Sequence, residues 1–79
     1  MPWMVIRDRV GQPIEATPCV KDCFDRLEGA ARLRRSKGHK VVKVSARIYE
    51  ATSPSGEVEY LSVDDGAPDF PPGRPPLRR

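Results

Sequence analysis

The chain has 79 residues, of which 38% are apolar and nine are prolines. A chain of this length holds at most one domain with one small core. Its net charge of +3 is too small to indicate a class of partner by itself. No apolar run approaches the roughly 20 residues that span a bilayer, and no signal-peptide pattern opens the chain. We therefore expect a protein of the cytoplasm, either of its own cell or of an infected host.

The first segment is predicted to form a strand and a short hairpin. Residues Trp3 to Arg9 are typical of a strand, and Val10-Gly11-Gln12-Pro13 contains turn-forming residues. Residues Ile14 to Ala16 can then pair back as a brief second strand. This hairpin would add one or two strands to the sheet that the rest of the chain predicts.

A helix is predicted from Pro18 to Lys37. Thr17 suits the N-cap, and Pro18 suits the first helical position, where a missing N–H has no cost. Gly38 is a typical residue to end the helix. Apolar residues at helical spacing form one stripe that is expected to face the core: Val20, Cys23, Phe24, Leu27, Ala30 and Ala31.

A β-hairpin is predicted after the helix. Residues 40–50 alternate between apolar and polar side chains, and the turn-forming run Ser53-Pro54-Ser55-Gly56 leads to a return strand over 57–63. Four side chains of the first strand are expected to face the helix: Val42, Val44, Ala46 and Ile48.

The alternation also predicts a register for this hairpin. Ile48 would lie opposite Leu61 and Ala46 opposite Val63 on the inner face, because a slip of one residue would turn these strands over. The same register sets Tyr49 opposite Tyr60 on the outer face. It also sets Glu50 opposite Glu59, which is a mild electrostatic cost.

These elements predict an α+β fold of the form β(β)αββ. One amphipathic helix would cover one face of a mainly antiparallel sheet of three to four strands, a two-layer domain over residues 1–63. Residues 64–79 hold five of the nine prolines and end in arginines, so they are expected to form an extended tail. Phe70 would anchor that tail.

The residues that carry chemistry do not form a catalytic pattern. Cys19 and Cys23 would lie one helical turn apart, where a disulfide joins nothing distant, so no structural disulfide is expected. These cysteines and His39 are too few and wrongly spaced for structural zinc, and we expect no metal or cofactor. His39 has no acid close in sequence, Cys19 has no evident base, and no phosphate-binding glycine loop is present. The chain is therefore interpreted as non-enzymatic.

Basic residues concentrate around the end of the helix and the next strand. No acidic residue interrupts this group, which could form one basic corner that binds nucleic acid through its phosphates. A solvated surface with arginines near a helix C-terminus is the alternative. The residues of this corner are Arg32, Arg34, Arg35, Lys37, Lys40, Lys43 and Arg47.

The uncovered face of the predicted sheet is the second candidate surface. Aromatic and basic side chains on such a face suit a protein interface or stacked single-stranded bases, while a routine solvated face is the alternative. The predicted partner-binding residues are Tyr49, Tyr60, Arg47, Lys43, Val58 and the tail residue Phe70.

The leading hypothesis is a small adaptor or inhibitor that docks on another protein. The uncovered sheet face, a strand edge and the tail would make the contact, and a homodimer through an edge or face is a further option. In size and lack of motifs the chain resembles the short one-domain proteins that phages and mobile elements encode to block host machinery, anti-CRISPR proteins among them. A nucleic-acid-binding protein that uses the basic corner and both tyrosines is the alternative function.

Overall fold

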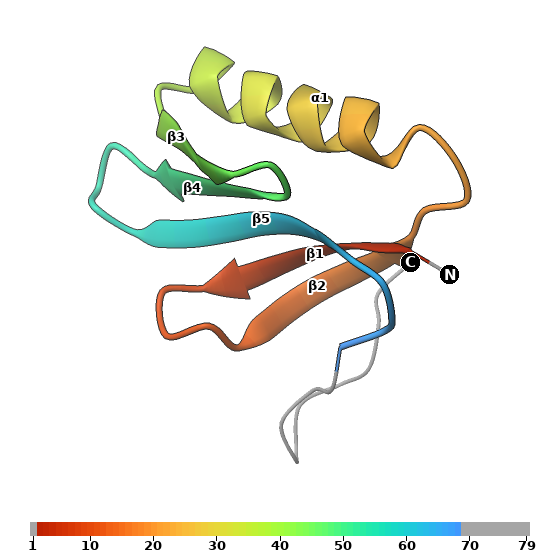
Figure 1. Cartoon of the computed structure of the whole chain (residues 1–79). Coiled ribbons are helices and arrows are strands. Elements are labelled where there is room, and N and C mark those ends of the chain that lie inside the picture. The colour runs from red at the N-terminus through yellow and green to blue at the C-terminus, as the bar shows by residue number, and fades with distance from the viewer. Residues whose placement is uncertain (1, 69–79) are drawn as a thin grey trace.

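The computed structural model describes residues 2–68. One helix packs on a five-stranded antiparallel sheet (Figure 1). The elements in chain order are β1 (Trp3–Asp8), β2 (Pro13–Pro18), α1 (Cys23–Ser36), β3 (Lys40–Ser45), β4 (Ile48–Thr52) and β5 (Val58–Asp64). The predicted α+β class is confirmed, with five strands where three to four were expected. The tail beyond Pro68, with Phe70, lies outside the described residues.

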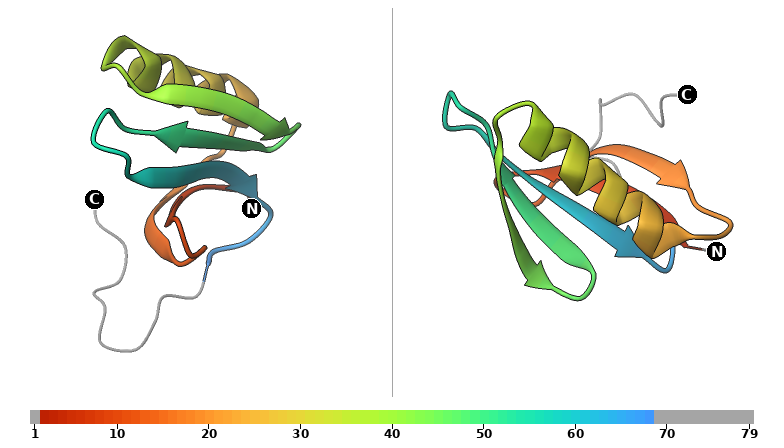
Figure 2. Two further views of the ribbon diagram at one scale, coloured as in Figure 1. Left: turned by 90° about the vertical axis from the view of Figure 1, so that its left-hand side faces the viewer. Right: turned by 90° about the horizontal axis from the view of Figure 1, so that it is seen from above.

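The strands are ordered β2-β1-β5-β4-β3 across the sheet. The first and last strands pair at its centre, with Trp3 opposite Asp64 at one end and Asp8 opposite Glu59 at the other. The helix therefore connects the two edges of the sheet, from β2 to β3. Figure 2 shows it above β5, with β1 and β2 on one side and β3 and β4 on the other.

The N-terminal hairpin forms as predicted and is longer than expected. The Asp8 carboxylate ends β1 by accepting hydrogen bonds from the backbone N–H groups of Val10 (3.1 Å) and Gln12 (2.9 Å). This side-chain bonding is typical of an aspartate that opens a turn. The returning strand then extends to Pro18, which lies opposite Trp3.

The helix begins at Cys23, five residues later than predicted. Thr17 and Pro18, the expected cap and first residue, are instead paired with β1 in the sheet. Pairing across the hairpin thus overrides a good local capping signal. Asp22 takes the N-cap position with a left-handed φ of 59°, and it makes no side-chain capping bond. At the other end the prediction is confirmed, because Gly38 follows the C-cap with a φ of 91°.

The core lies between α1 and the centre of the sheet. Leu27 and Ala31 are the buried residues of the helix, and Cys23 and Ala30 pack beside them. Two residues of the predicted stripe are exposed, because Val20 precedes the helix and Phe24 lies on its outer side. The sheet contributes the other buried members of this core: Ile6, Tyr49, Leu61 and Val63.

The predicted strand over 40–50 is in fact a tight hairpin. It breaks at Ala46 and Arg47, where the backbone N–H of Arg47 donates to the hydroxyl of Ser45 (3.3 Å). Ala46, expected to face the core, is exposed in this turn. The turn at 53–56 was predicted correctly: the N–H of Gly56 bonds the carbonyl of Ser53 (2.9 Å).

The predicted register of β4 against β5 is wrong by one residue. Tyr49, and not Ile48, lies opposite Leu61. Leu61 and Val63 are in the core as predicted, so it is the β3–β4 hairpin that is turned over relative to the prediction. Tyr49 consequently faces the helix, while Val42 lies on the other face of the sheet, since side chains alternate along a strand.

This register is favoured by two side-chain arrangements. It brings the aromatic ring of Tyr49 into the core, where the hydroxyl still reaches the Glu28 carboxylate (2.8 Å). It also places Glu50 opposite Tyr60, whose hydroxyl donates to it (3.2 Å), in place of the predicted contact with Glu59. A buried aromatic with a bonded hydroxyl and the relief of a like-charge pair both stabilise the observed pairing.

Truncation of the helix centre should test this core. Leu27 is 1% exposed, so Leu27→Ala should lower the free energy of unfolding by about 2–5 kcal/mol through lost burial and a cavity. Leu33 on the same helix is 53% exposed, so Leu33→Ala should change it by less than about 0.5 kcal/mol. Urea unfolding followed by circular dichroism measures both variants. Equal effects would mean that the helix packs through a different face.

Candidate functional site

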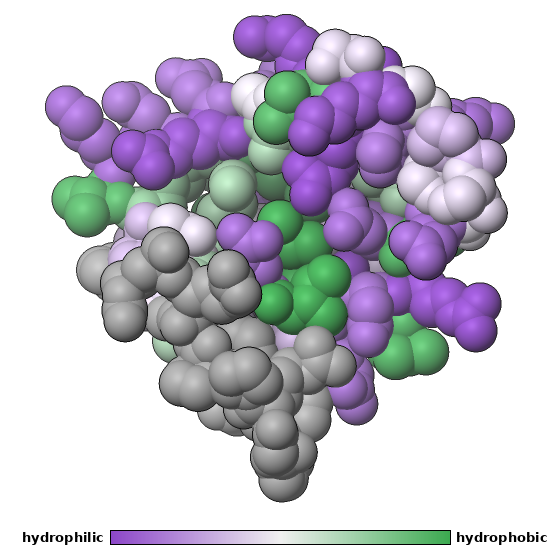
Figure 3. Space-filling model, turned by 180° about the vertical axis from the view of Figure 1, so that it is seen from behind, coloured by the Kyte–Doolittle hydropathy of each residue, from purple (hydrophilic) through white to green (hydrophobic). Residues whose placement is uncertain are grey.

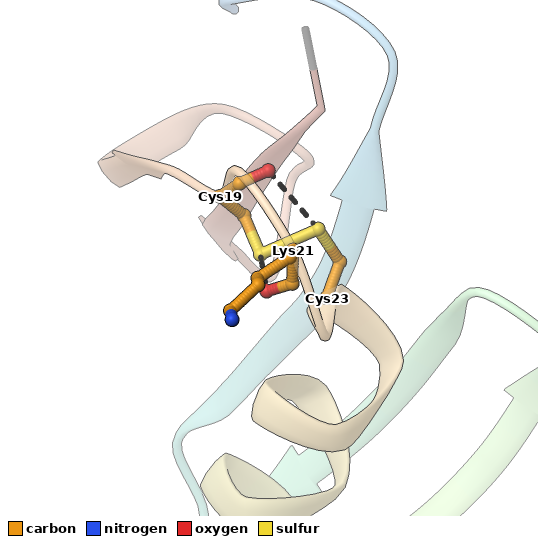
Figure 4. The surroundings of a disulfide bond; sticks show 3 residues. All are labelled: Cys19, Lys21 and Cys23. Carbon is orange, nitrogen blue, oxygen red and sulfur yellow. Dashed lines mark hydrogen bonds between the residues drawn. A yellow bond between two sulfur atoms is a disulfide. The ribbon is translucent and has the colours of Figure 1, made fainter.

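The two cysteines are joined by a disulfide, which corrects the prediction (Figure 4). The prediction placed both on one helix, but only Cys23 is helical, while Cys19 lies in the connection from β2. The Cys19 N–H donates to the Pro2 carbonyl (3.0 Å), so the disulfide ties the helix start to the beginning of the first strand. The described cysteines hold no free thiol in this state.

His39 lies beside a groove of about 470 Å³ between α1 and the first two strands. Its backbone N–H bonds the carbonyl of Arg34 (2.9 Å), and its Nδ1 atom is buried without a partner. Apolar residues (Met4, Ile6, Ala30 and Leu33) line part of the groove, with charged residues around them. From behind, the molecule shows a hydrophobic area with hydrophilic side chains beside it (Figure 3). Within residues 2–68, no acid is bonded to the imidazole to orient it as a base.

The two tyrosines lie on opposite faces of the sheet, so the predicted pair does not form. Tyr49 is in the core under the helix, and Tyr60 lies opposite Glu50 on the other face. The hydrogen bond to the Glu28 carboxylate, followed by burial, raises the pKa of Tyr49. The hydrogen bond to Glu50 raises the pKa of Tyr60 in the same way. Both hydroxyls are bonded within the domain, and the rings cannot form one stacking platform.

The other predicted contact residues are also spread over the molecule. Lys43 lies over the ring of Tyr49, with its Nζ atom 5.8 Å from the ring centre. Arg47 is at the tip of the β3–β4 hairpin and pairs with Asp65 (3.2 Å). Val58 is half-buried at the start of β5, opposite Thr52. The described members of the predicted partner-binding set therefore do not form one surface, and Phe70 lies outside the described residues.

The predicted basic corner is divided by the fold. Arg34 is ion-paired with Glu59 (2.9 Å) and lines the groove with Lys37, while Arg35 points to β3. Arg47 is a strand length from Lys40, roughly 20 Å. Arg32, Arg35, Lys37, Lys40 and Lys43 are exposed at separate positions of the helix and β3. The seven residues thus do not form one corner, although Arg35, Lys40 and Lys43 lie on or beside β3.

The far face of the sheet is only partly open. Val5 lies on it between Ala16 and Ser62 in neighbouring strands, and all three are buried. Arg7 crosses this row, because its guanidinium bonds both the Ser62 hydroxyl (2.9 Å) and the Asp64 carboxylate (2.6 Å). The exposed apolar part of the sheet is therefore its β3 side.

The edge strand β3 is the apolar surface that the structure brings together. Val42 is 46% exposed and Val44 is 58% exposed, although both were predicted to be in the core. We define the β3 edge surface as Arg35, Lys40, Val42, Lys43 and Val44. Its valines were missed because Val41 and Val42 are equally apolar neighbours, so alternation alone does not show which of them faces inward. The one local sign of a hairpin here is Ser45, whose hydroxyl accepts a hydrogen bond from the Arg47 N–H in the turn.

The possible metal ligands of the described residues are dispersed. Among them, no three acidic, histidine or cysteine side chains are close enough to hold a metal ion. The helix is neither long enough nor apolar enough to cross a membrane. Comparisons with protein-family models, with curated proteins and with solved structures gave no match.

The disulfide can be tested chemically. Without a reductant, the folded chain should not react with a thiol-alkylating reagent, and after reduction it should take up the reagent at Cys19 and Cys23, as measured by intact mass. Because the closed loop is short, reduction should lower the free energy of unfolding by about 2 kcal/mol. Alkylation of the untreated protein at both positions would contradict the disulfide.

The Tyr49–Glu28 hydrogen bond predicts a pH dependence. A tyrosine whose pKa is raised by folding stabilises the domain at pH values below its ordinary pKa of 10.0, and this contribution is lost as the pH rises through the folded value. In a Tyr60→Phe background, absorbance of the phenolate should show Tyr49 ionising above 10.0. Glu28→Gln should move this titration toward 10.0 because it removes the negative acceptor. An unchanged titration in that variant would contradict the bond.

Proposed function

We propose that this chain is a non-enzymatic binding protein that acts by protein–protein contact, as an adaptor or inhibitor, through the β3 edge surface. One observation carries the proposal. Two exposed valines, Val42 and Val44, lie on a strand that has no neighbouring strand on one side among residues 2–68. Folded domains normally protect such an edge, and an edge that is both apolar and unpaired is suited to contact with another chain.

The charges around these valines support a protein partner of complementary charge. Lys40 and Lys43 flank Val42 in the same strand, and Arg35 reaches that strand from the end of the helix. An apolar centre with a charged border is the common arrangement of a protein interface. Arginine is also among the residues that contribute most to binding at such interfaces.

Nucleic acid is the weaker candidate for the same surface. Binding to phosphates benefits from concentrated free cations, but Arg34 and Arg47 are paired with Glu59 and Asp65. Stacking of bases benefits from exposed aromatic rings, but Tyr49 is buried under the helix. The β3 edge surface holds two exposed valines among its three cations, and such an apolar centre suits a protein contact better.

Site-specific crosslinking in the source cell tests the proposal. A photoreactive residue at Val44 should capture one defined partner, because this position is 58% exposed within the proposed contact. The matched control is the same residue at Val10, which is 72% exposed in the β1–β2 turn and should not capture that partner. The partner is then identified by mass spectrometry, and Val42→Asp should reduce its capture from position 44.

Two results would count against this function. One is equal capture of the same protein from both positions, since that would indicate nonspecific collision. The other is tight, salt-dependent binding of labelled oligonucleotides that Lys43→Ala and Arg35→Ala weaken, measured by fluorescence anisotropy. That second result would favour the nucleic-acid alternative.

A further inference from the structure

We infer that the β3 edge takes up an extended segment of the partner as a sixth strand, and that this segment alternates acidic and apolar residues. The inference rests on the proposed function and names the kind of partner that the β3 edge surface fits. Three features of the described chain carry it: the direction of the backbone groups of β3, the prolines at the opposite edge, and the exposed side chains on the two faces of β3.

The pairing of β4 shows which backbone groups of β3 are free. The Ser53 N–H donates to the Glu57 carbonyl (2.8 Å), so these two residues form a hydrogen-bonded pair. In an antiparallel ladder such pairs alternate with non-hydrogen-bonded pairs, so every second residue of β4 directs its N–H and C=O groups to β5. Ala51 and Tyr49 therefore direct their backbone groups to β5, while Thr52 and Glu50 direct theirs to β3.

The same alternation shows which backbone groups of β3 are bonded to β4 and which point outward. Lys40 and Val42, opposite Thr52 and Glu50, use their backbone groups within the sheet. Val41 and Lys43 consequently direct their N–H and C=O groups outward. The guanidinium of Arg35 agrees with this, since it bonds the Val41 carbonyl (3.4 Å) from outside the ladder. A carbonyl has two lone pairs, so the Val41 oxygen can accept a further hydrogen bond from an incoming strand.

The opposite edge of the sheet is less suited to accept a strand. Strand β2 begins at Pro13 and ends at Pro18. Prolines lack the N–H donor and are a common protection of edge strands. No proline occurs in β3. Of the two edges, β3 is therefore the one without a proline, and its pairing with β4 is regular from Lys40 to Lys43.

The side chains of β3 define the chemistry of the incoming segment. On the helix side, an added strand would pass Lys43 and Arg35, which favour carboxylates. On the far side it would pass Lys40 at the start of β3 and then Val42, and the exposed valine favours an apolar residue opposite it. Because side chains of a strand alternate between the two faces, the complementary segment alternates acidic and apolar residues.

The same charges disfavour a second copy of the chain as the added strand. Two β3 strands in antiparallel contact around Val42 would bring Lys43 of each copy, together with Arg35, to the same side of the joined sheet. Cations gathered in this way repel one another, with no acid of β3 to offset them. A partner strand with carboxylates turns this repulsion into attraction.

Titration with synthetic peptides, followed by amide NMR, tests the inference. The probe is a capped peptide that alternates glutamate and valine. Its length of about eight residues is enough because strands usually have 3–10 residues. It should shift the amides of Val41 and Lys43 and slow their hydrogen exchange, while the Val42 amide, already bonded to β4, should gain little protection. Lys43→Glu should weaken binding roughly tenfold. Lys21→Glu, on the exposed connection before the helix, should leave it unchanged.

Two control peptides separate the outcomes. A peptide that alternates lysine and valine should not bind, and equal binding would overturn the acidic assignment. Two further glutamate–valine peptides carry N-methyl groups, each along a different one of the two backbone edges. If the peptide adds as a strand, only the version whose methylated edge faces away from β3 should bind. Equal binding by both versions would overturn strand addition. Protection of Val41 and Lys43 at high protein concentration without peptide would assign the edge to a second copy instead. If the peptides fail while crosslinking from Val44 succeeds, the proposed function stands and strand addition is rejected.

Discussion

The pairing of β1 with β5 is the interaction on which the rest of this domain depends. It joins segments more than fifty residues apart, with Trp3 opposite Asp64, and it places Ile6 beside Leu61 at the centre of the sheet. Leu27 of the helix packs against that centre. Because the two ends of the folded chain occupy the middle, the helix must cross from one edge to the other, and β3 becomes an outer strand.

The orientation of the β3–β4 hairpin follows from what the centre of the sheet can bury. Next to Leu61, the ring of Tyr49 fills the space under the helix, and its hydroxyl reaches the Glu28 carboxylate at the helix surface. The smaller side chain of Val42 is then left on the far face. A strand has only two faces, so the burial of one set of side chains exposes the other.

Ion pairing inside the domain decides which cations remain for a partner. Arg34 and Arg47 each contact an acid of the same chain, and Arg7 is bonded within the far face of the sheet. Lys43 and Arg35 make no ion pair with the described residues and lie beside the free backbone of β3. The β3 edge surface therefore combines unpaired backbone, apolar side chains and available positive charge.

The sequence by itself determined the α+β class, the helix end at Gly38, the N-terminal hairpin and the turn at 53–56. These features rest on local chemistry: helical periodicity, glycine at a left-handed φ, and turn-forming side chains. Only the tertiary structure decided the helix start at Cys23, the inward position of Tyr49 and the exposure of Val42. The helix starts late because Thr17 and Pro18 pair with β1. Val41 and Val42 are equally apolar, so the face of β3 that points inward is selected only when Tyr49 packs beside Leu61. The candidate surface belongs to this second group, because an edge exists only once the order of all five strands is set.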